Sequence, residues 1–357
     1  MAHNRRRLDE ERGRPDDQLE LDLLRRERGG RESLLILIIS ASTDEAAEAV
    51  HAELRLGGHA STLLDVDRFP ARDRIQYARA SNGQLQHRSY WLDGTRIDLQ
   101  EVTAILWRRP SKAGAVPGVD DQRVRQYVET ASEEVLEGLF DDLDCLQVPA
   151  RRHVVRQAYA KIPQLGLAAK LGFTVPATLV TNDPAAFLDF YREHGGRVIT
   201  KTASVKTDSW LGPMGTGYAR LVRPRDLVHA QDVQLCPFIV QRYVEKAVEI
   251  RATVVGSDVF AAEIHSQATR RTRVDWRRYD RHTTPHEVHE LPAKTARMLV
   301  ALVQAMGLVY GAIDLILTPD GEYVFVEVNP NGQYLWIERL TGLPITKRIV
   351  RLLVDGV

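Results

Sequence analysis

The sequence near the carboxyl end predicts a β-hairpin that sets two acidic side chains against each other. Residues 309–317 and 323–328 each have the apolar composition of a strand, and Asp320-Gly321 between them is a strong turn signal. If these two residues form the turn, counting outward places Asp314 directly opposite Glu327. Their Cβ atoms would then lie about 4.5–5.5 Å apart.

Two facing carboxylates repel each other, so this hairpin is expected to hold a cation. Asn329 lies two residues beyond Glu327 and therefore projects from the same face. Carboxylate and amide oxygens suit Mg²⁺, which takes its other ligands from water and substrate phosphates. Asp314, Glu327 and Asn329 are therefore candidate Mg²⁺ ligands. The alternative is a solvated sheet face whose acids happen to oppose each other.

Size and charge limit the class of protein. The 357 residues are enough for two or three domains. Lys plus Arg equals Asp plus Glu at 48 each, so no net field favours nucleic acid or membrane, and neither is expected as a partner. Cys145 and Cys236 lack metal or redox spacing, which fits a reducing cytoplasm. No apolar run reaches the roughly 18 residues of a spanning helix, and the polar N-terminus does not resemble a secretory signal.

Strand, helix and turn signals divide the chain into five segments. Residues 1–32 form a charged tail with no assigned chemistry. Residues 33–112 read as strand, helix and strand, which predicts a small parallel α/β domain. Residues 113–148 contain a linker and a long amphipathic helix. Two further segments, 149–237 and 238–357, mix helices with strands, so the predicted fold class is α/β.

Two local features of the first half give further predictions. Asp93-Gly94 predicts a hairpin turn. The long helix is predicted to pack on a core through one apolar face. This face consists of Val124, Tyr127, Val128, Val135, Leu136 and Leu139.

Two stretches could bind a nucleotide, although neither pattern is specific. Lys201 ends a predicted strand, and the glycine-bearing residues 204–217 after it could cradle phosphate with backbone N–H groups. Glu249 follows an extended segment and could accept hydrogen bonds from ribose hydroxyls. This extended segment consists of Gln241, Arg242, Tyr243 and Val244. Its backbone N–H and C=O groups could bind the edge of a purine. Each pattern also fits a solvated lysine or an ordinary strand, and the sequence has no Walker A loop.

An arginine-rich stretch has two possible roles, and a nearby pair of histidines does not fit a zinc-protease motif. The arginine-rich residues 270–281 around Trp276 could hold a polyphosphate or an acidic peptide, or could form a solvated basic loop. His286 and His289 do not form a zinc-protease helix, because they are three residues apart rather than four.

Several motifs, taken in order, resemble the ATP-grasp superfamily. Within it they are similar to the microviridin-type (graspetide) ligases, which cyclise ribosomally made precursor peptides. The resemblance spans roughly residues 33 to 355. Its most specific motifs are residues 107–110, 170–176, 181–184, 263–267, 275–277 and 327–338.

The resemblance implies a fold and two cofactors, ATP and Mg²⁺. The fold is α+β ATP-grasp, in which a small parallel α/β pre-ATP-grasp domain precedes two α+β lobes that clamp ATP. Residues 149–237 would form the central lobe, and residues 238–357 the C-terminal lobe with the metal-binding hairpin.

The resemblance also implies roles for individual residues. The ATP-binding residues would be Lys161 and Lys201 at the phosphates, Gln241 to Val244 at adenine through the backbone of Arg242 and Val244, and Glu249 at ribose. Asp314, Glu327 and Asn329 would hold Mg²⁺. The catalytic residues, which steady the transferred phosphoryl group and the acyl phosphate, would be Arg251 and Arg277, with Asn331 nearby.

Three functions are compatible with these residues. The first is a ligase that phosphorylates Asp or Glu side chains of a precursor peptide and closes ester or amide rings, with a leader segment docked on the enzyme; relatives suggest a homodimer. The second is an ATP-grasp ligase that adds a free amino acid to a peptide, a small molecule or a protein C-terminus, as glutathione synthetase-like relatives do. The third is a nucleotide-binding protein without ligase activity.

Overall fold

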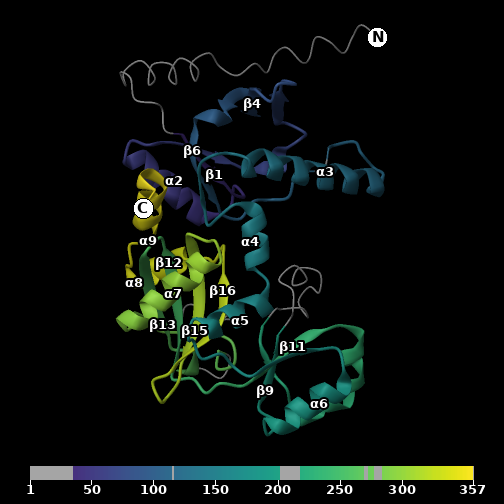
Figure 1. The fold of residues 1–357 in the computed structure, drawn as a ribbon, viewed down its shortest axis with the longest axis vertical. Coiled ribbons are helices and arrows are strands. Elements are labelled where there is room, and N and C mark those ends of the chain that lie inside the picture. Colours follow the sequence, from purple (N-terminus) through teal and green to yellow (C-terminus); the bar gives the residue numbers. More distant parts are fainter. Residues whose placement is uncertain (1–34, 115, 202–217, 269–271, 277–283, 357) are drawn as a thin grey trace. The chain divides into compact units, whose positions relative to one another are not determined.

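The computed structural model describes residues 35–114, 116–201, 218–268, 272–276 and 284–356. It divides into two compact units, Met1–His153 with Thr346–Val357 and Val154–Ile345 (Figure 1). The charged tail 1–32, the glycine-bearing stretch 204–217 and Arg277 lie outside the described residues. None of the described helices is long and apolar enough to cross a membrane.

The first unit is built on a parallel sheet, as the strand–helix–strand pattern predicts. The strand order is β2-β1-β6-β7, and every pair of neighbours is parallel. Helix α2 (Glu45–Leu56) connects the first two strands, and Asp44 caps it by accepting the Ala46 N–H at 3.0 Å. The strands are β1 (Leu35–Ile39), β2 (Ala60–Leu64), β6 (Val102–Trp107) and β7 (Leu146–Val148).

An antiparallel sheet is inserted in the sequence between β2 and β6. It confirms the predicted turn at Asp93-Gly94, because Leu92 pairs with Thr95 and both turn residues have positive φ, at 50° and 82°. Its strands are β3 (Arg74–Arg79), β4 (Leu85–Leu92) and β5 (Thr95–Asp98).

The predicted long helix is present as α3 (Gln122–Asp141), but its apolar face is only partly buried. Leu136 and Leu139 belong to the core of this unit. Tyr127 is 74% exposed, Val135 51% and Val124 44%, so the prediction is wrong for these three residues. Helix α9 (Ile345–Asp355) ends the chain.

The second unit contains two sheets. The smaller sheet has the order β10-β9-β11-β8, with β8 (Thr178–Thr181), β9 (Val198–Lys201), β10 (Arg220–Leu221) and β11 (Phe238–Arg242). Helix α6 (Pro184–Glu193) and a 3₁₀ helix (Pro224–Leu235) accompany it. Asp183 caps α6 through its bond to the Ala185 N–H at 2.8 Å. The predicted boundary at residue 238 assigns β11 to the last segment, yet β11 pairs here with β8 and β9; the finer division of the chain stays a prediction.

The larger sheet carries the acidic hairpin, and Figure 1 shows α7 lying over it. Its order is β14-β13-β12-β15-β16. The strands are β12 (Val248–Val255), β13 (Asp258–Ile264), β14 (His286–Val288), β15 (Tyr310–Leu317) and β16 (Tyr323–Asn329). The remaining helices are α4 (Arg152–Ala158), α5 (Lys161–Lys170), α7 (Ala293–Ala305) and α8 (Leu335–Thr341). Because residues 286–288 are a strand, the exclusion of a zinc-protease helix is confirmed.

The hairpin brings Asp314 opposite Glu327 as predicted, but by a different route. The turn has three residues rather than two, since Thr318 accepts the Gly321 N–H at 3.0 Å and donates its own N–H to Glu322 at 3.0 Å. This turn alone would shift the register by one residue. A β-bulge after Asp314 compensates, because it lets β16 contain one extra residue before Glu327.

Candidate functional site

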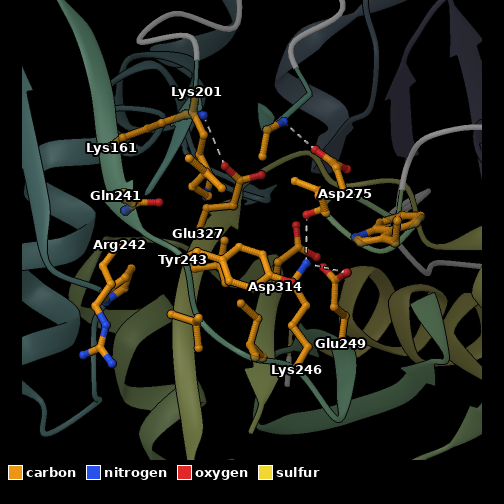
Figure 2. Close-up of a pocket in the computed structure, with 18 residues that line it drawn as sticks. Lys161, Lys201, Gln241, Arg242, Tyr243, Lys246, Glu249, Asp275, Asp314 and Glu327 are labelled. Carbon is orange, nitrogen blue, oxygen red and sulfur yellow. Dashed lines mark hydrogen bonds and ion pairs between the residues drawn. The ribbon is translucent and has the colours of Figure 1, made fainter. Parts of the chain in front are cut away.

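Most of the sequence-predicted residues line one pocket of the second unit, between the two sheets, whereas Arg251, Asn329 and Asn331 are not part of its lining (Figure 2). Its empty volume of about 690 Å³ includes space open to solvent. This is in the range of about 300–1,000 Å³ that small-molecule sites occupy. The predicted residues that line it are Lys161, Lys201, Gln241, Arg242, Tyr243, Val244, Glu249, Asp314 and Glu327.

The three predicted metal ligands lie in contact. Nδ2 of Asn329 is 3.3 Å from Oδ2 of Asp314 and 3.4 Å from Oε1 of Glu327. The donor set of two carboxylates and an amide fits Mg²⁺. Asn329 presents its NH₂ group to the carboxylates here, so it would have to rotate its amide to offer Oδ1 to a cation.

Two cations offset the charge of the facing carboxylates. Nη1 of Arg251 lies 2.9 Å from Oδ1 of Asp314, and Nζ of Lys161 lies 3.2 Å from Oε2 of Glu327. Arg251 is 5% exposed and sits directly opposite Asp314 in β12. The site therefore contains balanced charges, with cationic groups already beside the oxygens that would bind metal.

The strand predicted to read adenine is held by its own sheet. The N–H of Arg242 donates to Ala177 at 2.9 Å, and the N–H of Tyr243 donates to Arg197 at 2.8 Å. Gln241 is 3% exposed and donates its side-chain amide to Oγ1 of Thr178 at 3.0 Å. In Figure 2 the guanidinium of Arg242 points away from the carboxylates, so its side chain is not directed at the metal site.

The side chain of Glu249 is 12% exposed, and this burial raises the pKa of its carboxyl above the usual value. Nζ of Lys246 lies 2.9 Å from Oε1 of Glu249 and opposes that rise. The same ammonium donates to the carbonyl of Val274 at 2.9 Å, so it ties β12 to the segment that contains Asp275.

Sequence reasoning missed Lys246 and Asp275, both of which line the pocket. Asp275 is 5% exposed and accepts the N–H of Ala219 at 2.8 Å. In the sequence Asp275 belongs to the motif at residues 275–277, which does not by itself predict a place in the pocket. Lys246 precedes Glu249 by three residues. This short spacing from an acidic residue expected in the pocket is the sequence signal that could have predicted Lys246 there.

Among the residues that the structure describes, the pocket lining does not include two of the predicted catalytic residues. Arg277 lies outside the described residues. Asn331 follows β16, and its Oδ1 is buried with no hydrogen-bond partner in the described part of the chain. The adjacent Gly332 is required by close packing, because a Cβ there would lie 2.3 Å from Cβ of Ala312 and 2.7 Å from Nη2 of Arg251.

Two family models match the chain. The RimK-like ATP-grasp domain matches residues 165–353, and the MvdD pre-ATP grasp domain matches residues 35–154. The search of curated proteins found no match.

Solved structures resemble the chain across both units. The macrocyclase MdnC from Microcystis aeruginosa, solved with precursor peptide MdnA, is 28% identical with a TM-score of 0.78, over 90% of this chain and 99% of that one. A RiPP-associated ATP-grasp ligase from Chryseobacterium gregarium, solved with ADP and a leader and core peptide, is 26% identical with a TM-score of 0.81, over 91% and 97%. The macrocyclase MdnB from Microcystis aeruginosa is 27% identical with a TM-score of 0.73, over 90% and 100%.

Proposed function

The chain belongs to the RimK-like ATP-grasp family, and from that premise we propose that it is an ADP-forming ligase that closes ester or amide rings in a ribosomally made precursor peptide. The observation that carries the ligase assignment is that Asp314 and Glu327 both line one pocket and are paired with Arg251 and Lys161, respectively. The likeness of both units to macrocyclases supports a peptide as the substrate.

Phosphoryl transfer needs positioning and neutralisation of oxygen charge more than covalent help from the protein. Asp314, Glu327 and Asn329 would hold Mg²⁺, which supplies that neutralisation on the triphosphate. Lys161 and Lys201 would bind phosphate oxygens. Because Lys161 already lies at Glu327, it can serve the carboxylate before the nucleotide binds and a phosphate afterwards.

The nucleoside would bind between the two sheets, with its purine at the smaller sheet and its ribose at Glu249 of β12. Since the N–H of Arg242 already bonds to Ala177, we assign the carbonyl of Arg242 and the N–H of Val244 to the purine edge. Glu249 would accept the ribose hydroxyls, with Lys246 holding its carboxyl in place.

The reaction would follow two displacements. A side-chain carboxylate of the peptide attacks the terminal phosphorus of ATP, and ADP leaves. A hydroxyl or amine of the same peptide then attacks the resulting acyl phosphate, loses its proton and expels inorganic phosphate. Arg251 and Arg277 would steady the oxygens that carry charge in both steps. The peptide loses one water for each ring closed, and the oxygen of that water leaves in the phosphate.

A single experiment separates the three functions compatible with the sequence. The purified protein is incubated with ATP, Mg²⁺ and a short Asp/Glu- and Thr/Ser/Lys-rich peptide, and ADP and peptide mass are measured. Peptide-dependent ADP release with loss of one water mass per link supports the proposal. Gain of a residue mass from an added amino acid would support the second function, and ATP binding without ADP formation the third.

Two further assignments accompany this proposal. Consumption of ATP and two free thiols, Cys145 and Cys236, support a cytoplasmic location. We also propose a homodimer, which light scattering of the purified protein would test.

A further inference from the structure

A buried glutamine joins the helix that carries Lys161 to the strand that carries the carboxylates. Oε1 of Gln164 accepts the N–H of Val328 at 2.9 Å, and Nε2 donates to the carbonyl of Val328, also at 2.9 Å. The same Nε2 donates to the carbonyl of Ala158 at 2.6 Å. Gln164 is 3% exposed, so these bonds form away from water.

The contact with Val328 lies between two of the proposed metal ligands. Val328 stands between Glu327 and Asn329, in the last strand of the sheet order, and both of its backbone polar groups bond to the one side chain. At the edge strand β16, Gln164 therefore makes the two backbone hydrogen bonds to Val328 that a neighbouring strand could have made. It fixes β16 at the residue that separates two proposed metal ligands.

Helix α5 depends on this anchor for its position. Among the described residues, no side chain caps its N-terminus at Ala160. Lys161 and Gln164 are three residues apart and are therefore neighbours on one helix face. Fixing Gln164 to β16 thus fixes the rotation of the first turn, and with it the 3.2 Å approach of Lys161 to Glu327.

The far end of α5 has its own attachment to the strand. The N–H of Phe325 donates to the carbonyl of Thr174 at 2.8 Å, and the rings of Phe173 and Phe325 pack with centroids 6.0 Å apart. Losing Gln164 would therefore leave α5 docked while freeing the turn that carries Lys161.

We propose that Gln164 is a positioning residue that sets the distance of Lys161 from the metal-binding strand. The inference rests on the proposed function, because it assigns Lys161 to the nucleotide phosphates. Gln164 does not line the pocket, so its effect should pass through Lys161 rather than through direct contact with ATP.

The test is a double-mutant cycle between Gln164→Met and Lys161→Met. Methionine nearly matches the volume of glutamine and removes its hydrogen bonds, and Gln157→Met, at an exposed position of α4, is the matched control. The readouts are kcat/KM for ATP, the affinity for MgATP by calorimetry, and the melting temperature. We expect Gln164→Met to lower kcat/KM about 10–100-fold in the wild-type background. In the Lys161→Met background the same change should lower kcat/KM about 2-fold or less. Gln157→Met should leave all readouts unchanged.

Each other outcome has a defined meaning. If the two effects multiply in full, or if Gln164→Met lowers only the melting temperature, Gln164 does not act through Lys161 and the inference is overturned. If Gln164→Met does not fold, Gln164→Asn, which keeps the amide but cannot reach both partners, takes its place in the cycle. If the wild type releases no ADP, the proposed function fails, and the same cycle in MgATP affinity still decides the role of Gln164.

Discussion

Nζ of Lys161 lies 3.2 Å from Oε2 of Glu327, so the first residue of α5 neutralises a carboxylate of β16. The pair is partly buried, with side-chain exposures of 21% and 14%. A metal that takes the oxygens of Glu327 would compete with this lysine and leave its ammonium for another anion. In our proposal Lys161 therefore pairs with Glu327 before the nucleotide binds and with a phosphate afterwards.

Glu327→Gln should lower peptide-dependent ADP release by about 100-fold or more, because the amide can neither neutralise Mg²⁺ nor pair with Lys161. Glu322→Gln, at the exposed turn of the same hairpin, should retain activity and serves as the control. The measurement is the rate of ADP formation over a Mg²⁺ titration. Full turnover by Glu327→Gln would rule out the metal assignment.

The hairpin shows what the sequence could and could not predict. Asp93-Gly94 and Asp320-Gly321 carry the same dipeptide, yet only the first forms a two-residue turn. Pro319 precedes the second pair and has no N–H with which to close such a turn, so the turn widens. The pairing of Asp314 with Glu327 was correct because an unpredicted bulge compensated for this shift.

Other parts of the site depend on contacts between distant segments. Lys246 joins Glu249 to Val274, and Asp275 binds Ala219, and no local periodicity reports either contact. Gln164 bonds to a strand 164 residues further along the chain. Strand alternation and the turn signal predicted that Asp314 faces Glu327, and the family resemblance implied Lys161, whereas the contacts that hold the site required the tertiary fold.

Gly332→Ala should destabilise the protein by about 1–3 kcal/mol and impair activity, because the new Cβ would overlap Ala312 and displace Arg251. Gly166→Ala is the matched control, since a Cβ there meets nothing within 4 Å and the site is inside α5. That change should stabilise by about 0.5–1 kcal/mol. Urea unfolding measures both, and equal effects of the two substitutions would refute the packing argument.

Lys246→Met should move the acid limb of kcat/KM for ATP to higher pH. Burial raises the pKa of Glu249 above its ordinary value of 4.5 and Lys246 lowers it, so removing the lysine allows a further rise. The carboxyl then takes up its proton at higher pH and loses strength as an acceptor for ribose. Lys170→Met, at the exposed end of α5, is the control for loss of a positive charge.

Lys246→Met should also change how the free energy of unfolding depends on pH. Because the folded pKa of Glu249 exceeds the unfolded value, its protonation favours folding below about pH 4.5, and this contribution disappears as pH rises through the folded pKa. Lys246→Met should therefore lose more stability between acid and neutral pH than the wild type does. Parallel urea titrations across this range measure the difference, and coincident profiles would contradict it.

Arg251→Lys should lower kcat about 10–100-fold while leaving the fold intact. The guanidinium spans Oδ1 of Asp314 at 2.9 Å and the carbonyl of Gln333 at 3.3 Å, whereas a single ammonium cannot reproduce that fork. Arg192→Lys is the control, because Arg192 pairs with a neighbouring acid on the exposed face of α6. Single-turnover ADP formation at saturating ATP separates chemistry from binding. If Arg251→Lys weakened only ATP binding with an unchanged rate constant, Arg251 would act in docking the nucleotide rather than in steadying the transferred phosphoryl group.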